Sequence, residues 1–397
     1  MNPGSRNSGR RELLRSSAAA AGVLLLKPET VFGTQANSSV EVGLVGCGNR
    51  GTWIAPLFAE YAGARIVALC DVFRDQLENA QRKLKLESAR TYLGLAAWRE
   101  LISSRLDAVV LQTPPCFFPE MVEAAVEAGK HVYLAKPVAV DVPGSLRILA
   151  AGEKARGRVS LFVDFQIRAR PAFQEAVARV RRGDIGPPVL GHVYYHASHL
   201  SRRDRPGMSP GEARLRNWYF DRALSGDVMI ERDIHVIDAA NWYLGARPEK
   251  ACGTGGQKAR PGWGDCWDHF VVIYWYPGGV KVDFSSAEFT KGYRDLCVRL
   301  YGPTGTVDSH YGGLVQITGD NPWKGAEEDD TQRGGTIANV RAFIASIASG
   351  QYVNNVPESV ESNLTAILGR TAAYEGRVVS WGEMMRRNER YEAKLEL

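Results

Sequence analysis

The residues of this chain most suited to chemistry surround a histidine in an otherwise apolar segment. Within residues 225–242, helical spacing places Asp227, Glu231, His235, Asp238 and Trp242 on one stripe. Isoleucines flank the stripe, so we expect the helix to be mostly buried and its polar side chains to need a partner or a cavity. Carboxylates one turn away favour the charged form of an imidazole and orient its ring. We interpret His235 as a proton acceptor oriented by Glu231, and the alternative is a structural histidine satisfied by its helix neighbours.

A second candidate is Lys136, which follows the apolar run 131–134 and precedes Pro137. Ligands of open α/β sheets bind at the carboxyl ends of parallel strands. When a secondary alcohol gives its hydride to a cofactor, its hydroxyl proton must leave as the carbonyl forms. His235 would accept that proton, and Lys136 would polarise the same oxygen and stabilise its negative charge. The alternative for Lys136 is an ordinary surface lysine.

The elements that would hold a hydride acceptor begin near the start of the chain. A strand-like run at 42–45 leads into a G-x-G-x-x-G turn, and a helix-like stretch at 52–61 follows. The first glycine permits the tight turn, the second leaves room for a pyrophosphate, and the third lets helix and strand pack closely. We predict a dinucleotide site at Gly46, Gly48, Asn49, Arg50 and Gly51.

Asp71 indicates which dinucleotide binds. It ends the next apolar run, about 20 residues after the last glycine, where a carboxylate binds the adenosine ribose hydroxyls. Arg74 could meet a 2′-phosphate, but Asp71 repels that group. We therefore predict NAD as the cofactor, with NADP as the alternative.

Aromatic residues are candidates for binding the substrate, because their rings commonly stack on sugar faces. Trp218 and Tyr219 lie just before the histidine segment, so we group them with His235 as substrate residues. Further candidates in Gly/Pro-rich loops are Trp263, Trp267 and Trp323. The alternative for each aromatic residue is a place in the core or in an interface.

The elements that must position these residues fall into two halves. Up to residue 165, apolar strand-like runs such as 108–112 and 160–165 alternate with helix-like stretches at about 119–128 and 142–156. This alternation predicts a doubly wound parallel sheet of the α/β class. After Gln166, period-2 runs at 270–276 and 280–285 flank a Pro-Gly-Gly turn, which predicts an antiparallel sheet. Helices at about 337–349 and 357–374 close the chain.

The first 36 residues have the pattern of an export signal. The pair Arg10-Arg11 precedes an apolar run at 16–26, and small residues follow at 34–36, which indicates a twin-arginine signal peptide and a periplasmic or secreted protein. The alternative is a disordered basic tail. We predict three parts: a signal at 1–36, a Rossmann domain at 37–157, and an α+β substrate-binding and oligomerisation domain at 158–397.

Composition excludes several classes of function. The chain has 397 residues and a formal net charge of +5, which comes largely from the leader, so no basic pattern points to nucleic acid. The six cysteines lack metal-ligand spacing, so we predict no metal site. No later segment has the length and apolarity of a membrane span, so we expect no membrane anchor after signal removal.

The chain resembles the Gfo/Idh/MocA oxidoreductase family. The likeness rests on the glycine turn 46–51, Thr113-Pro114-Pro115, residues 128–132, Lys136-Pro137 and the segment around His235. The resemblance implies a Rossmann domain, then a domain with a large open antiparallel sheet, and usually dimers or tetramers formed through that sheet. It also implies that Lys136 and His235 line the nicotinamide and substrate site. The cofactor residues that it adds are Thr113, Pro114 and Gln166.

Two positions depart from the family pattern. The family usually has Glu before the Lys-Pro pair, where this chain has Ala135, so the lysine loses a charged neighbour. One turn before the histidine the family usually has Asp, where this chain has Glu231, whose extra methylene changes its reach. Both departures alter the groups that would pass a proton.

An export signal on a nicotinamide enzyme implies a cofactor that folds in before export and is restored in the same site. The resulting hypothesis is a nicotinamide-dependent oxidoreductase that acts on a secondary hydroxyl of a sugar, sugar derivative or cyclitol with a tightly held cofactor. The first alternative is an NAD-dependent glycoside hydrolase or lyase that works through transient oxidation of the sugar. The second is a non-catalytic sugar-binding protein.

Overall fold

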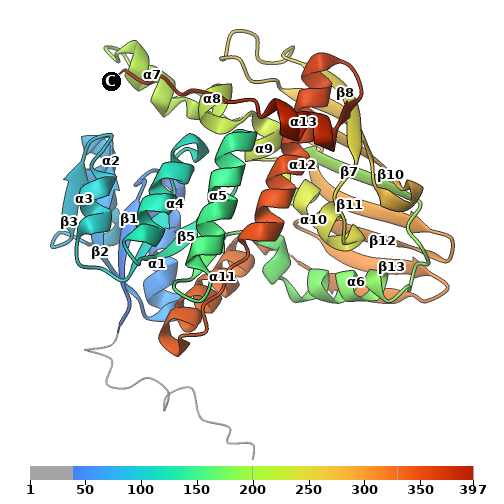
Figure 1. Ribbon diagram of the computed structural model, residues 1–397, viewed down its shortest axis with the longest axis horizontal. Coiled ribbons are helices and arrows are strands. Elements are labelled where there is room, and N and C mark those ends of the chain that lie inside the picture. Colours follow the sequence, from blue (N-terminus) through green and yellow to red (C-terminus); the bar gives the residue numbers. More distant parts are fainter. Residues whose placement is uncertain (1–38, 199, 329, 397) are drawn as a thin grey trace, which may run out of the picture. The chain divides into compact units, whose positions relative to one another are not determined.

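Continuous apolar strands build the first sheet of the protein. A computed structural model describes residues 39–198, 200–328 and 330–396 (Figure 1). The first sheet is entirely parallel and has the order β3-β2-β1-β4-β5-β6. The order reverses between β1 and β4, which is where ligands bind in doubly wound sheets. The strands are β1 (Glu41–Val45), β2 (Arg65–Asp71), β3 (Arg90–Leu93), β4 (Ala108–Leu111), β5 (His131–Leu134) and β6 (Leu161–Val163).

Helices connect these strands close to the predicted limits. The helix after the glycine turn begins three residues earlier than expected, because Gly48 is already its N-cap. Glycine in the left-handed conformation ends it at Gly63, where φ is 66°. The helices are α1 (Asn49–Ala62), α2 (Arg74–Leu84), α3 (Trp98–Ser103), α4 (Phe118–Glu127) and α5 (Val142–Ala155).

The second half of the chain forms a nine-stranded sheet in the order β14-β13-β12-β11-β7-β10-β9-β8-β15. The predicted hairpin around the Pro-Gly-Gly turn is confirmed as the antiparallel pair β9–β10, whereas β10 and β7 run parallel, so the sheet is mixed and mostly antiparallel. Its strands are β7 (Leu190–His196), β8 (Lys250–Gly256), β9 (His269–Trp275), β10 (Lys281–Ala287), β11 (Asp295–Gly302), β12 (Gly305–His310), β13 (Leu314–Gly319), β14 (Trp323–Glu327) and β15 (Val379–Ser380).

Alternation along the strands gives the second sheet one buried and one open face. On β9, Phe270 and Val272 are fully buried, whereas Val271 and Ile273 are 52% and 43% exposed. The buried face is covered by α6 (Pro171–Arg181), α10 (Ile234–Leu244) and α12 (Val356–Glu375).

The helices at the end of the chain pack against both sheets. Helix α12 contacts both α5 and the second sheet, and α11 (Thr331–Ser349) packs on α1 of the first half (Figure 1). The rings of Phe343 on α11 and Phe58 on α1 form an edge-to-face pair, with centroids 6.5 Å apart. The last helix is α13 (Trp381–Arg387).

The predicted leader at 1–36 lies outside the described residues, and the predicted domain limits remain a prediction. Strand β6, which follows the predicted end of the Rossmann domain at residue 157, belongs to the parallel sheet. Across the described part of the chain, no helix combines the length and apolarity that crossing a bilayer requires.

Candidate active site

The histidine segment is broken into two helices, which corrects the prediction of one continuous stripe. Helix α9 (Val228–Glu231) is capped by Arg232, and α10 begins at Ile234. Asp227 starts α9 in a left-handed conformation, with φ of 84°, and its side chain accepts from the amide of Val228. Glu231 is therefore the last residue of α9, whereas His235 belongs to the first turn of α10.

Glu231 forms an ion pair with Lys136 instead. The Lys136 Nζ lies 3.4 Å from Oε1 of Glu231 and also donates to the Glu231 carbonyl oxygen. Both side chains are largely buried, at 16% and 9% exposure. Burial lowers the pKa of Lys136, and the Glu231 carboxylate partly opposes that shift. Burial likewise raises the pKa of Glu231, which the charge of Lys136 opposes.

His235 is buried and neutral, so the expectation of a carboxylate-stabilised charge is wrong. Burial, followed by the positive charges of Lys136, Arg50 and Arg232, lowers its pKa well below the ordinary value of 6.5. Among the described residues its Nδ1 has no hydrogen-bond partner. The ring lies edge-on to Phe165 at 6.4 Å and tilted to Tyr311 at 5.5 Å. A neutral imidazole is the form that can accept a proton.

Asp238 braces α10 rather than acting on His235. It is fully buried and receives a bidentate pair from Arg168, with Nε 2.9 Å from Oδ2 and NH2 2.8 Å from Oδ1. Ser362 of α12 donates to the same carboxylate at 2.7 Å. These contacts tie α10 to Arg168 and to α12, which gives Asp238 a structural role.

Lys136 and His235 line the same cavity, called here the His235 cavity. It lies at the carboxyl ends of the parallel strands, because Lys136 follows β5 and Asp164 follows β6. Trp218 and Tyr219 also line it, with rings stacked at 3.8 Å. The remaining predicted residues on its wall are Arg50, Thr113, Gln166 and Glu231.

Arg50 and Gln166 are held by one buried carboxylate. Arg50 NH2 lies 2.6 Å from Asp164 Oδ2, and Gln166 Nε2 donates to the same oxygen at 2.9 Å. Asn339 of α11 donates to the other oxygen of Asp164 at 2.9 Å. Asp164 therefore fixes two side chains that the sequence assigned to the cofactor.

The glycine turn has the geometry that a dinucleotide requires. Gly46 has φ of 94°, and a Cβ there would lie 2.6 Å from the carbonyl oxygen of Gln112. A Cβ on Gly51 would lie 1.9 Å from the Gly46 carbonyl oxygen, whereas one on Gly48 would meet nothing within 4 Å. Gly46 and Gly51 thus allow the close packing, and Gly48 leaves open space beside the turn.

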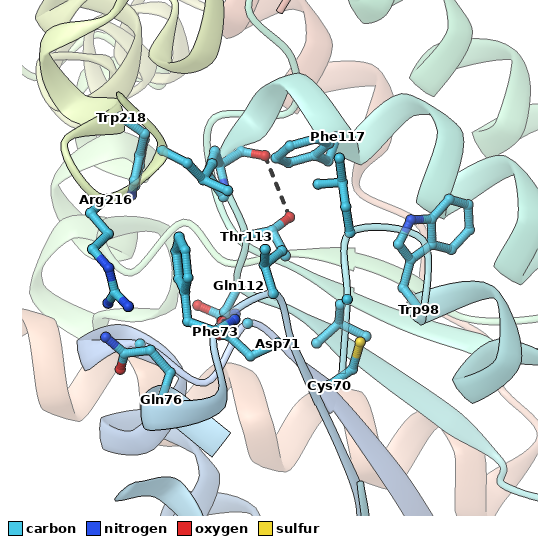
Figure 2. Close-up of a pocket in the computed structure, with 18 of the residues that line it drawn as sticks. Cys70, Asp71, Phe73, Gln76, Trp98, Gln112, Thr113, Phe117, Arg216 and Trp218 are labelled. Carbon is cyan, nitrogen blue, oxygen red and sulfur yellow. Dashed lines mark hydrogen bonds between the residues drawn. The ribbon is translucent and has the colours of Figure 1, made fainter. Parts of the chain in front are cut away.

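A second cavity adjoins the turn and is called here the Asp71 cavity (Figure 2). Asp71 accepts the amide of Cys47 at Oδ2 and that of Phe73 at Oδ1, both at 2.8 Å. Its pKa is raised by burial, which these amides oppose. Gly46, Gly48 and Pro114 line this cavity, and Thr113 and Trp218 line both cavities. Asn49 is exposed at the first turn of α1 and is not among the residues lining either cavity.

Among the residues on the wall of the His235 cavity that sequence reasoning missed are Arg232, Asp164 and Tyr311. Arg232 forms an ion pair with the buried Glu288, and NH1 also donates to the Ser198 carbonyl at 3.1 Å. An arginine inside an apolar segment was a usable signal for it. Asp164 carried the signal of a polar residue at the end of an apolar strand. Tyr311, just past β12, carried none, because only the fold brings it to His235.

Comparison with known proteins connects this arrangement to described families. A profile for an oxidoreductase family with an NAD-binding Rossmann fold matches residues 40–165, and a GFO/IDH/MocA C-terminal domain profile matches residues 173–308. The NAD(+)-dependent scyllo-inositol 2-dehydrogenase of Bacillus subtilis is 27% identical over 278 residues, covering 68% of this chain and 73% of that one. Myo-inositol 2-dehydrogenase of Thermotoga maritima is 25% identical over 322 residues, covering 79% and 89%.

A solved structure has the same fold. Scyllo-inositol dehydrogenase from Lactobacillus casei, with bound NAD(H) and scyllo-inositol, superposes with a TM-score of 0.69 at 18% identity. The superposition covers 87% of this chain and 100% of that one.

Proposed function

The chain belongs to the Gfo/Idh/MocA oxidoreductases and carries their NAD-binding Rossmann domain, and we propose that it oxidises a secondary hydroxyl of a sugar, sugar derivative or cyclitol. One observation carries the proposal. Lys136 and His235 line one cavity, and Thr113 and Trp218 line both that cavity and the one at the glycine turn and Asp71. A proton acceptor and a cation therefore lie together beside a dinucleotide site.

Each residue of the site has a separate role in this reaction. Neutral His235 takes the hydroxyl proton while the C–H bond of the same carbon breaks and the carbonyl forms. Lys136, held by Glu231, donates to the developing carbonyl oxygen and stabilises its negative charge. Bound NAD supplies the hydride acceptor. Trp218 and Tyr219 offer aromatic faces to the ring of the substrate.

The dinucleotide would be held along the edge of the parallel sheet. Gly46, Gly48 and Gly51 let the backbone approach the pyrophosphate at the start of α1. Asp71 lines the Asp71 cavity, where its carboxylate would bind the ribose hydroxyls. Arg50 and Gln166, fixed by Asp164, would bind at the other end, in the cavity that contains His235.

We include in the proposal that the protein is exported through the twin-arginine route and keeps its cofactor through turnover. The support is the leader pattern around Arg10 and Arg11, since an exported enzyme has no ready supply of nicotinamide. Fractionation of the producing cell, followed by mass measurement of the mature N-terminus, tests export. Protein found only in the cytoplasm with its leader intact would refute it.

We also propose a homodimer or homotetramer formed through the open face of the second sheet. Val271 and Ile273 on β9 leave apolar surface exposed there, and such patches mark interaction sites. Light scattering combined with Ile273→Glu tests the assembly. We expect the wild type to be at least dimeric and the variant to dissociate, and a wild type that is monomeric at micromolar concentration would refute the proposal.

The test of the proposed function uses the purified protein with inositols, aldoses and aryl glycosides. We expect a ketone or lactone product by mass spectrometry, with enzyme-bound NADH formed in a single turnover, and a product rate from His235→Gln far below that of the wild type. Aglycone release without net oxidation would instead establish the glycosidase alternative. Turnover unchanged in His235→Gln would refute the assignment of this base under either reaction.

A further inference from the structure

A segment of the second half of the chain lies over the Asp71 cavity. Residues 200–218, called here the strap, leave the second sheet after β7 and run through α7 (Pro210–Arg216) before the histidine segment. Arg216 and Trp218 of the strap line the Asp71 cavity together with Asp71 and Phe73 (Figure 2). Leu215 of the strap also lines it. The wall of the predicted dinucleotide site is therefore built from both halves of the chain.

Two arginines of the strap bind one carboxylate on the opposite side. Arg216 makes a bidentate pair with Asp75 at 2.7 and 3.2 Å, and Arg205 NH1 lies 2.9 Å from the same side chain. Asp75 belongs to the first turn of α2, four residues after Asp71. Its pKa is lowered, first by the hydrogen bond from Arg216, so Asp75 remains ionised. We call this set of three residues the latch.

Arg216 is largely buried, although it lies on a connecting segment. Its side chain is only 7% exposed, and its guanidinium lies 3.8 Å from the centre of the Phe73 ring. Glu212, one turn earlier on α7, accepts from its Nε at 2.8 Å. Phe73 donates its amide to Asp71, so the latch is fixed to the same turn that carries the predicted ribose carboxylate.

The strap has internal bonds that keep it folded over the cavity. The buried Asn217 accepts from the amide of Arg203 at 2.7 Å and donates to Asp204 at 2.9 Å. Asn217 also donates to the Ala213 carbonyl at 2.9 Å, which closes α7. Because these bonds hold the strap together, the ion pairs at Asp75 restrain the whole strap over the Asp71 cavity.

We propose that the strap retains the dinucleotide, with Arg216 as a wall residue of its adenosine end and the latch as the contact that must open before it leaves. The inference rests on the proposed retained cofactor and explains how the fold achieves it. A single ion pair at a protein surface contributes little free energy, but a bidentate arginine and a second arginine on one carboxylate act together. Opening the latch also separates Phe73 from the guanidinium that covers it.

The test measures how fast NADH leaves the full-length protein. NADH is loaded, an excess of NAD is added, and release is followed by the loss of energy transfer from protein tryptophan to the nicotinamide. We expect Asp75→Asn to release NADH about tenfold faster than the wild type, equivalent to about 1.4 kcal/mol. Higher salt should speed release from the wild type more than from the variant, because it screens the exposed Asp75.

The matched control is Glu41→Gln, which removes the exposed ion pair Arg65–Glu41 in the same half of the chain. We expect its release rate to stay within twofold of the wild type. Equal NADH release rates in Asp75→Asn and the wild type, with equal melting temperatures, would overturn only the proposed role of the strap. A wild type that does not hold NADH through gel filtration would overturn the strap together with the retained cofactor, although not the oxidoreductase chemistry.

Discussion

Replacing Glu231 by Gln should lower the pKa of Lys136. The two groups lie 3.4 Å apart, so their interaction is about 1.2 kcal/mol at the permittivity of water and about 4.9 kcal/mol at an effective permittivity of about 20. Losing this interaction should lower the pKa of Lys136, since the Glu231 carboxylate stabilises the ammonium. Both side chains are mostly buried, which favours the larger of the two energies.

The sign follows from the charges. Burial already lowers the pKa of Lys136, and the carboxylate is the largest influence that raises it. Without the carboxylate the ammonium loses its proton at lower pH, so any reaction step that needs Lys136 charged should fail at lower pH. The alkaline limb of the activity profile should therefore move to lower pH in Glu231→Gln.

The assay does not depend on knowing the substrate. The rate at which an acylating reagent labels Lys136, read by peptide mass spectrometry over a pH series, reports the fraction of the neutral amine. Glu153→Gln serves as the control, because it removes an exposed ion pair with Arg156 on α5. A Lys136 titration that does not move in Glu231→Gln, or that moves to higher pH, would refute the reasoning.

Three further variants test other parts of the account. His235→Gln should lower kcat by about 10² to 10⁴, the usual contribution of a general base. Wild-type activity should persist below pH 6.5, because the His235 pKa lies well below that value. A kinetic pH series on both proteins checks these two expectations. Arg168→Ala should lower the free energy of unfolding by about 3 to 5 kcal/mol in a urea titration, since it leaves the buried Asp238 without its cation, whereas Arg156→Ala at an exposed pair should cost less than about 1 kcal/mol. Gly51→Ala should lower the melting temperature because its Cβ would lie 1.9 Å from a carbonyl oxygen, while Gly48→Ala, with open space around its Cβ, should keep the melting temperature and weaken NADH binding by calorimetry. Equal effects of the two alanines on stability would contradict the roles given to these glycines.

Local patterns were enough to predict the first half of the fold. The glycine turn, the apolar strands and the acid at Asp71 each depend on neighbours within a few residues, so the chain shows them directly. The hairpin at residues 277–279 was predictable for the same reason. The parallel pairing of β10 with β7 was not, because nothing local links strands so far apart in the sequence.

The sequence predicted which residues form the candidate site better than it predicted the contacts between them. The sequence brought forward Lys136 and His235, and both line one cavity. It paired Glu231 with His235 because it assumed an unbroken helix, whereas the chain breaks after Glu231 and that carboxylate meets Lys136. Such a break depends on what the segment packs against.

The strap was beyond sequence reasoning altogether. Arg216 and Asp75 are 141 positions apart, and neither belongs to a recognisable motif. Only the packing of the two halves of the chain brings the arginine onto Phe73.

The central claim is that an imidazole and an ammonium face a bound nicotinamide, and a crystal structure with NADH and a bound polyol tests it most directly. We predict that the nicotinamide ring enters the cavity between Lys136 and His235, with a substrate hydroxyl in contact with both side chains. A nicotinamide bound elsewhere, or a polyol that contacts neither residue, would contradict the account.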